Sequence, residues 1–380
     1  MNIYRVGGSV RDELLGLAVT DRDYVVVGAT PEALVDKGFR SVGKDFPVFL
    51  HPVTQEEYAL ARTERKTAPG YQGFAFHAAP DVTLEQDLAR RDFTINAMAL
   101  DDAGTLIDPY HGADDLKARL LRHVGPAFAE DPVRILRGAR FAARFGFAIA
   151  PQTLALMRAM AASGEVDALV PERVWQELAR GLMEAAPLGM FRVLDDCGAL
   201  VKVLPELLPA NAQFDAGAAN FRALQQAALL DLSLPVRFAA LTGMLDEAAA
   251  ARLAERIRVP KDCRDLALVY LRHAASFEHA ATLDAPALTE LIQGADGLRQ
   301  EARFVSLVAV AQLFSTESAI EAKAMSKRLL AALAAARGVD AGALARQHTE
   351  PQAIAAAVKA ARVAAVAATV HFSASQPPRS

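Results

Sequence analysis

The sequence has 380 residues, 52% hydrophobic and 23% charged, and this balance excludes a disordered chain and favours two or three folded domains. Its 41 Lys and Arg residues are outnumbered by 45 Asp and Glu residues, so the chain is not coated in positive charge. We find no apolar run of the roughly 18–20 residues that a membrane span needs and no apolar signal core at the N-terminus. With two cysteines, too few for a disulfide framework, the chain is predicted to be a soluble cytoplasmic protein.

The first 110 residues predict a small mixed α/β domain. Short β-branched or aromatic runs alternate there with helix-like segments. Helices are predicted over 9–15, with Ser9 as N-cap, and over 31–37, where Pro31 follows the capping residue Thr30. A turn signal at 101–104 predicts a hairpin between 98–100 and 105–107. The other predicted strands are 3–6, 23–27, 39–42, 48–50 and 57–61.

Beyond about residue 113 the strand signals vanish and apolar residues recur at helical spacing. Helices are predicted over 131–145, 151–162, 171–184 and 188–197, and the alanine-rich stretch 319–370 predicts closely packed helices. The last residues, 371–380, are polar and contain proline, which predicts a disordered tail. The whole chain is therefore predicted to be an α+β protein, with a small mixed sheet in an N-terminal head and an all-helical remainder.

Two glycines, Gly7 and Gly8, stand between the first predicted strand and the first predicted helix. Glycines at such a turn allow backbone amides to approach a ligand, and a helix N-terminus favours an anion. Arg11 adds a positive charge in the same turn. The pattern predicts a phosphate-binding turn, and its alternative is a tight turn that binds nothing.

A pair of carboxylates follows about a dozen residues later. Asp21 and Asp23 are two residues apart at the start of a predicted strand, a spacing that directs both side chains to one side. Two hard carboxylates near a phosphate-binding turn are suitable ligands for Mg²⁺, which activates an attacking hydroxyl and stabilises a leaving diphosphate. Glu57, at the start of another predicted strand, is a candidate third catalytic carboxylate. The alternative is a charged turn before a buried strand.

Six sequence blocks together resemble a known family. G-G-S-V-R-D at 7–12 and D-R-D at 21–23 resemble the signature of the DNA polymerase β-like nucleotidyltransferase superfamily. The later blocks are similar to those of its class II tRNA nucleotidyltransferases, the CCA-adding enzymes. They are R-R-D-F-T-I-N-A at 90–97, I-D-P-Y-H-G at 107–112, E-D-P-V-R at 130–134 and P-E-R-V-W-Q-E at 171–177, in the family's order.

A helix near residue 131 places four arginines on one face. A step of about 100° per residue brings Arg134, Arg137, Arg140 and Arg144 to the same side, with Phe141 among them. Ile135, Leu136, Ala139 and Ala142 fall on the other side and are predicted to face the core. An aromatic ring among arginines suggests a cleft, whereas the alternative is a solvated basic face. Asp131, one turn before Arg134, is predicted to orient that guanidinium, and the pair offers donors and acceptors to a base edge.

The resemblance implies roles and domains for these residues. It implies that Asp131 and Arg134 read CTP or ATP, that Gly8, Arg11, Arg91, Arg137 and Arg140 bind the nucleotide and that Asp21 and Asp23 hold Mg²⁺. It implies a nucleotidyltransferase head at 1–125, a helical neck with the nucleobase motif at 126–205 and a helical body and tail at 206–370, followed by the disordered 371–380.

Two further segments bear on the activity. The charged, glycine-containing stretch 62–73 is predicted to be a mobile loop near the site, and in the family such a loop helps the change from C to A addition. Longer relatives carry an HD phosphohydrolase domain with the pattern R-F-A-x-L-x-H-D, where this chain reads R-F-A-A-L-T-G-M at 237–244. No histidine in the sequence precedes an aspartate, so we expect the helical scaffold without a functional HD site.

The predicted function is template-independent addition of C, C and A to the 3′ end of tRNA from CTP and ATP. A CC-adding or A-adding enzyme and a bacterial poly(A) polymerase remain alternatives within the family, and a non-catalytic tRNA-binding protein is an alternative outside it. The segment V-G-K-D-F-P at 42–47 resembles the CCA-adding form, and the presence of 62–73 favours complete CCA addition. The expected partners are tRNA, ATP and CTP, with no membrane and no obligatory protein partner.

Overall fold

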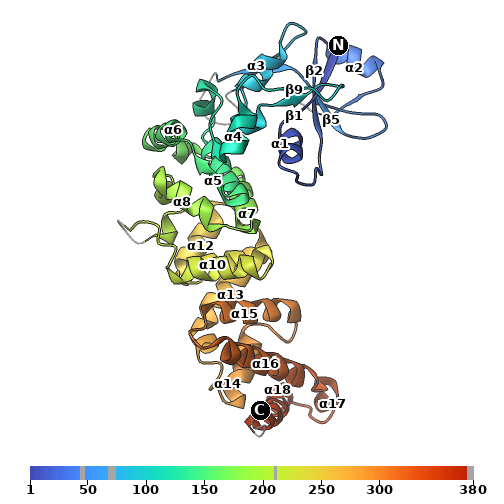
Figure 1. The fold of residues 1–380 in the computed structure, drawn as a ribbon. Coiled ribbons are helices and arrows are strands. Elements are labelled where there is room, and N and C mark those ends of the chain that lie inside the picture. The colour runs from blue at the N-terminus through green and yellow to red at the C-terminus, as the bar shows by residue number, and fades with distance from the viewer. Residues whose placement is uncertain (43–47, 67–73, 209–211, 375–380) are drawn as a thin grey trace. The chain divides into compact units, whose positions relative to one another are not determined.

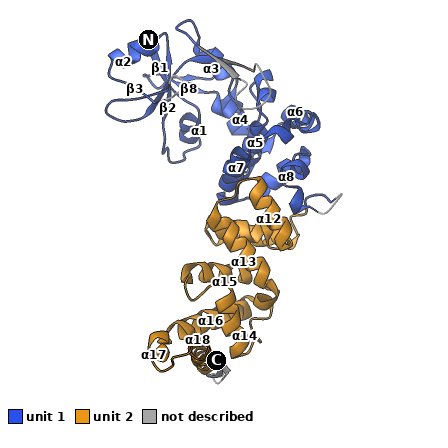
Figure 2. Ribbon diagram, turned by 180° about the vertical axis from the view of Figure 1, so that it is seen from behind, with its two compact units in different colours: residues 1–214 blue, residues 215–380 orange. Residues whose placement is uncertain are grey.

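The computed structural model describes residues 1–42, 48–66, 74–208 and 212–374. Within them the chain forms two compact units, residues 1–214 and residues 215–380 (Figure 2). The first unit carries an N-terminal sheet followed by helices, and the second consists of helices (Figure 1). The predicted division into head, neck, body and tail is finer than these two units, and it stays a prediction.

Seven strands of the described chain form one mixed sheet, in the order β3-β4-β5-β2-β1-β8-β9. At its centre β1 (Asn2–Val6) runs antiparallel to β2 (Asp23–Val27), and β2 runs parallel to β5 (Glu57–Leu60). The pairing sets Val6 opposite Asp23 at one end of β2. The outer strands are β3 (Arg40–Ser41) and β4 (Val48–Leu50) on one side and the hairpin of β8 (Ala99–Leu100) and β9 (Leu106–Ile107) on the other.

Strand β2 is buried on both faces because successive side chains alternate across a sheet. Val25 belongs to an apolar cluster that contains Leu88 of α3 (Leu84–Ala89), whereas its neighbour Val26 belongs to a second cluster that contains Leu34 of α2 (Pro31–Asp36). The two clusters fix β2 between two apolar layers. Its first residue, Asp23, is thereby held at the end of a rigid element.

The predicted elements of the head are largely confirmed, but the start of α1 (Gly8–Leu14) differs from the prediction. Ser9 was expected to cap this helix, but the cap is Gly7, whose φ is 73°. The Ser9 hydroxyl instead donates to the carbonyl of Val6, 3.1 Å away. Gly7 is needed there because a side chain rarely adopts a positive φ and because an added Cβ would lie 2.7 Å from Nη1 of Arg91.

Two short two-stranded sheets are present where no strands are predicted. Part of the predicted mobile loop, Arg62–Lys66, is strand β6, which pairs antiparallel with β7 (Phe74–Ala78); residues 67–73 of that loop lie outside the described residues. Beyond residue 113 strands were not expected, yet β10 (Leu120–Leu121) pairs parallel with β11 (Ala148–Ile149). Each of these last two strands has two residues, too few to produce an alternating pattern.

Helix α5 (Val133–Phe145) is the central helix of the rest of the first unit, and it contacts α7 (Pro171–Met183) and α8 (Leu188–Asp196). Ile135, Leu136, Ala139 and Ala142 are buried, which confirms the predicted core face of α5. Close packing on α8 requires Gly189, where an added Cβ would lie 3.1 Å from the backbone of Ala143. The first unit also contains α4 (Gly112–Ala118), α6 (Pro151–Ala162) and α9 (Leu200–Val203), with the short helices η3 (Glu165–Ala168) and η4 (Pro205–Leu207).

The second unit is helical throughout its described residues. Its long helices bury a core of phenylalanine and leucine side chains, including Phe238, Phe277 and Phe304. The helices are α10 (Ala219–Leu229), α11 (Leu234–Thr242), α12 (Glu247–Arg256), α13 (Lys261–Glu278), α14 (Ala285–Gly294), α15 (Glu301–Phe314), α16 (Ala319–Arg337), α17 (Ala341–Ala345) and α18 (Pro351–Ala374).

Helix α18 corrects two expectations. It continues to Ala374, so the predicted disordered tail cannot begin at 371; residues 375–380 lie outside the described chain. By length and composition alone, Pro351–Thr369 is also apolar enough to cross a membrane, with a mean hydropathy of 1.2, although no such run is expected from the sequence. Most of this hydropathy comes from small alanine side chains, and Lys359 within the window forms an ion pair with Glu290.

Candidate active site

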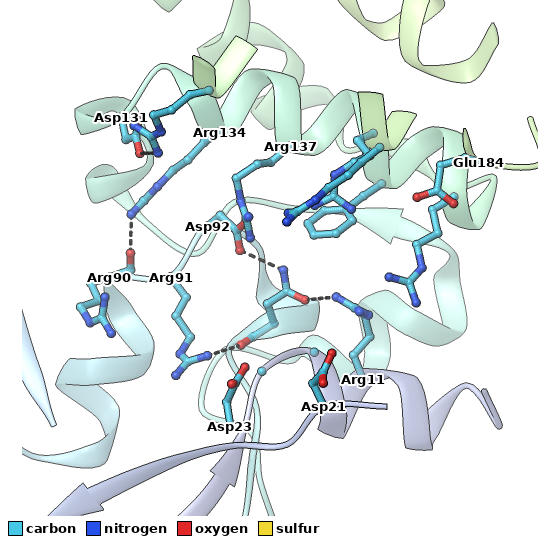
Figure 3. Close-up of a pocket in the computed structure, with 18 of the residues that line it drawn as sticks. Arg11, Asp21, Asp23, Arg90, Arg91, Asp92, Asp131, Arg134, Arg137 and Glu184 are labelled. Carbon is cyan, nitrogen blue, oxygen red and sulfur yellow. Dashed lines mark hydrogen bonds and ion pairs between the residues drawn. The ribbon is translucent and has the colours of Figure 1, made fainter. Parts of the chain in front are cut away.

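A cavity of about 980 Å³ lies within the first unit (Figure 3). Arginines dominate its wall, and carboxylates stand among them. The lining includes nine of the ten site residues expected from the sequence, namely Gly8, Arg11, Asp21, Asp23, Arg91, Asp131, Arg134, Arg137 and Arg140. Glu57 is not among the described residues that line it, although its place beside Asp23 in the parallel register puts both side chains on one face of the sheet.

Asp21 and Asp23 lie close together at the floor of the cavity (Figure 3). Burial is the main cause that raises the pKa of Asp23, and the charge of Asp21 raises it further, while Arg91 opposes both. A cation between the two carboxylates would stabilise their charged forms, and carboxylate oxygens are ligands that suit Mg²⁺. The donor set therefore fits a divalent metal ion.

Arg11 is buried beside the glycine turn, with 4% of its surface exposed. Its guanidinium donates to Asn96 Oδ1 at 2.5 Å and to Asp12 Oδ1 at 2.8 Å, and it lies over the ring of Phe145, 4.8 Å from the centroid. Burial lowers the pKa of Arg11, and Asp12 opposes that shift. The charge is thus fixed in one orientation at the cavity wall.

A hydrogen-bonded chain connects this turn to α5. Asn96, in the short helix η1 (Thr94–Asn96), donates through Nδ2 to Asp92 Oδ1 at 2.9 Å, and Arg137 donates through Nε to Asp92 Oδ2 at 2.7 Å. Burial alone would raise the pKa of Asp92, but Arg137 and Asn96 outweigh it and hold that pKa at about 2. Arg91 joins the same region, with Nη2 3.2 Å from Asp87 and Nη1 3.4 Å from the carbonyl of Asn96.

The arginine face of α5 points into the cavity, and protein carboxylates balance it. Arg140 donates to Glu177 of α7 at 2.6 Å, and Arg144 donates to Asp12 at 3.0 Å. Phe141 stands among the arginines, with the guanidinium of Arg140 4.5 Å from its ring centroid. The predicted cleft-facing arginine row is therefore present, and it is ordered by partners from two other elements.

The predicted contact between Asp131 and Arg134 is wrong. Arg134 donates to two carbonyls, that of Ala127 in η2 (Pro126–Glu130) at 2.9 Å and that of Arg90 at 2.7 Å. Asp131 is held instead by Arg173 of α7, through contacts of 3.2 and 2.9 Å. The partner lies 42 residues away, so spacing within one helix could not reveal it.

Several lining or supporting residues were not assigned roles from the sequence. Arg173 and Glu177 belong to the motif at 171–177, whose residues have no individual predicted roles. No pattern in the sequence distinguishes Asp87. Glu184, at the C-terminal end of α7, also lines the cavity; burial raises its pKa, while Arg144 and Arg140 oppose that shift. The signal that could have found the carboxylates is the excess of arginine, which requires counter-charges.

Comparison with known proteins decides the family. Residues 3–122 match the Poly A polymerase head domain, and residues 146–211 match the probable RNA and SrmB-binding site of polymerase A. The chain is 52% identical to a multifunctional CCA protein of Methylobacillus flagellatus, an alignment that covers 98% of each chain. It is 54% identical to one of Burkholderia mallei, over 97% of this chain and 99% of the relative. The chain belongs to the CCA-adding protein family.

Solved structures of CCA-adding enzymes have the same fold. One from Bacillus stearothermophilus in complex with CTP is 23% identical with a TM-score of 0.68, covering 98% of this chain and 93% of its own. Another, apo form II, is 20% identical with a TM-score of 0.73, covering 98% and 92%. The family and the α+β fold expected from the motifs are thus confirmed. The CCA proteins also carry residues that this chain lacks, because the aligned stretch of 404 positions exceeds its 380 residues.

Proposed function

We propose that this chain adds C, C and A to the 3′ end of tRNA without a template, using CTP and ATP and releasing diphosphate. The observation that carries the proposal is one cavity in which a carboxylate pair, Asp21 and Asp23, faces an ordered row of arginines. The carboxylates suit the reacting end of a nucleoside triphosphate and the arginines suit its phosphates. Membership of the CCA-adding family supports the choice of tRNA as the acceptor.

The triphosphate would be bound by groups that are already oriented. Arg11 and Arg91 lie beside the glycine turn, and Arg137 and Arg140 face them from α5. Gly8 lines the same cavity beside the guanidinium of Arg11. In this arrangement the arginines bind and orient the phosphates, and they neutralise the charge that develops on the leaving diphosphate.

Asp21 and Asp23 would hold Mg²⁺ in this site, and Glu57 is retained as a candidate third carboxylate from the adjacent strand. When bound, the metal ion supplies activation of the attacking hydroxyl and charge neutralisation of the triphosphate. The chain's own part is to fix the two carboxylates at the end of β2 and to keep positive charge on the opposite wall.

The nucleobase would be read by Asp131 and Arg134. A carboxylate accepts from the amino group that cytosine and adenine share, and a guanidinium donates to the ring nitrogen beside it. Uracil and guanine present a carbonyl where this amino group stands, so the carboxylate rejects them.

The tRNA acceptor arm would be bound through its shape and phosphates by the helical parts, as duplex RNA generally is. Both cysteines are free thiols, which supports a reducing compartment, the cytoplasm.

The test uses tRNA lacking its CCA end, with labelled CTP, ATP or both, and sizing of the products. Full extension with both nucleotides supports complete CCA addition. Products that stop after C-C would identify a CC-adding enzyme, and addition of A only to tRNA that already ends in C-C would identify an A-adding enzyme. Long A tails would identify a poly(A) polymerase.

With Asp131→Ala or Arg134→Ala, incorporation of UTP and GTP should rise relative to CTP and ATP by roughly tenfold or more. An equal loss for all four nucleotides would show that these residues bind phosphate.

A further inference from the structure

Arg173 forms a bidentate ion pair with Asp131, donating to both carboxylate oxygens. Its Nη1 lies 3.2 Å from Oδ1 and its Nη2 lies 2.9 Å from Oδ2, the fork-to-fork geometry that Arg forms with carboxylates. Arg173 is near the start of α7, whereas Asp131 precedes α5, so the contact also fixes one helix against the other. The Arg173 and Asp131 side chains are 28% and 18% exposed at the cavity wall.

The hydrogen bonds of Asp131 leave one direction open to a ligand. A carboxylate has about four acceptor positions, two on each oxygen. Oδ1 accepts from Arg173 and from the backbone amide of Val133, 3.1 Å away, whereas Oδ2 accepts from Arg173. Among the contacts of the described residues, the second position on Oδ2 is therefore the one left for a donor in the cavity.

Arg134 is fixed equally firmly one turn later. Its two Nη atoms donate to the carbonyls of Ala127 and Arg90, so its plane is set by two elements outside α5. A base edge that meets both residues must offer a donor to Asp131 and an acceptor to Arg134. Cytosine and adenine meet this requirement, whereas uracil and guanine present a carbonyl in place of the amino group.

We propose that Arg173 is a positioning residue for nucleotide selection, which directs the open acceptor position of Asp131 Oδ2 toward the amino group of cytosine or adenine. The inference rests on the proposed function and adds to it a residue that acts through Asp131. Without Arg173, Val133 alone holds the carboxylate, through Oδ1, and Oδ2 turns freely about the last side-chain bond. Selection then weakens, while the arginines that face the triphosphate keep their partners.

The experiment measures kcat/KM for CTP and for UTP on tRNA lacking its CCA end. Arg173→Met should lower the CTP-to-UTP ratio by about tenfold or more, the range that one bidentate base contact provides. The change should lie mainly in a raised KM for CTP, with kcat changed less. Arg173→Lys should fall between wild type and R173M, because Lys keeps the charge but not the fork. The matched control is Arg158→Met in α6, which removes an arginine of the same unit that donates to the carbonyl of Asp196 outside the cavity; its ratio should equal that of wild type.

A double variant tests whether Arg173 acts through Asp131. The ratio for D131A/R173M should be no lower than that for D131A alone, since the residue being positioned is already absent. A further fall, an unchanged ratio in R173M, or an equal loss of kcat/KM for all four nucleotides would each overturn the inference. Circular dichroism and melting temperature verify folding, and if R173M does not fold, R173K must show the lowered ratio instead. A wild-type chain that adds neither C nor A would overturn the proposed function itself.

Discussion

Arg140 of α5 and Glu177 of α7 form a buried ion pair, with Nε 2.6 Å from Oε2 and both side chains less than 10% exposed. Glu177 also lies 3.8 Å from Arg137, so one carboxylate serves two arginines of the cavity. Removing one partner of a buried pair leaves an uncompensated charge, which costs far more than the pair contributes relative to an apolar substitute. Glu177 thus stabilises the arginine row without being proposed to touch the nucleotide.

Glu177→Gln should therefore lower the free energy of unfolding by about 3 kcal/mol or more. The amide keeps the shape of the side chain but not its charge, so the loss reports the unpaired Arg140. Urea unfolding followed by circular dichroism measures it. Glu13→Ala is the control, because Glu13 pairs with Arg5 at the surface and a surface pair contributes about 0–1 kcal/mol. Equal effects of the two substitutions would contradict the argument.

Asp21→Ala and Asp23→Ala should each reduce nucleotide addition by at least about 10³-fold, because each removes a proposed metal ligand. Folding should persist, since neither side chain supports the apolar core of β2. Single-turnover extension of tRNA measures the loss. The exposed carboxylate Asp36 of α2 provides the control, and Asp36→Ala should retain wild-type activity. If either variant kept more than roughly a tenth of the activity, the metal assignment would be wrong.

Asp92 predicts a pH dependence of stability. Its pKa is about 2 in the folded chain, against an ordinary value of 3.8, so the folded state favours the charged form. The contribution of the charged Asp92 carboxylate to the free energy of unfolding is fully present above pH 3.8 and is lost as the pH falls through about 2. The difference in unfolding free energy between wild type and Asp92→Asn should thus be constant from pH 5 to 7, on the order of 2 kcal/mol, and shrink below pH 4. A difference that grew on acidification would contradict this sign.

The purified protein should not hydrolyse 2′,3′-cyclic AMP or p-nitrophenyl phosphate with Ni²⁺, Mn²⁺ or Mg²⁺. Helix α11 ends at Thr242, where the sequence continues Gly-Met in place of the His-Asp pair of longer relatives. Borderline and hard cations need several converging histidine or carboxylate ligands. Metal-dependent hydrolysis that co-purified with the full chain and survived in the Asp21→Ala variant would refute the prediction.

The sequence predicted what depends on near neighbours. The strands of the head and the core face of α5 follow from periods of two or about 3.6 residues, and the structure has them. Asp21 and Asp23 line one cavity, but Asp21 precedes β2, which begins at Asp23, so spacing within one strand does not account for their placement. The cap at Ser9 was misassigned because the positive φ of Gly7 is a backbone feature that residue type signals only weakly.

What the sequence could not predict depends on distant partners. Arg62–Lys66 becomes a strand because it pairs with Phe74–Ala78, and a charged segment on its own gives no such pattern. The predicted partner of Asp131 is Arg134, on the same predicted helix, whereas the observed partner, Arg173, comes from α7. Spacing indicates which residues share an element, but contacts between elements are decided by packing.

The chain of contacts from Arg11 through Asn96 and Asp92 to Arg137 has a consequence for binding affinity. A free arginine side chain loses roughly 1.5–2 kcal/mol of rotamer entropy when it is immobilised. Here that loss accompanies folding, because carboxylates, an amide and aromatic rings of the chain itself hold the guanidiniums. An arriving triphosphate meets a surface whose ordering is complete, so more of its interaction energy remains for binding and for reaction.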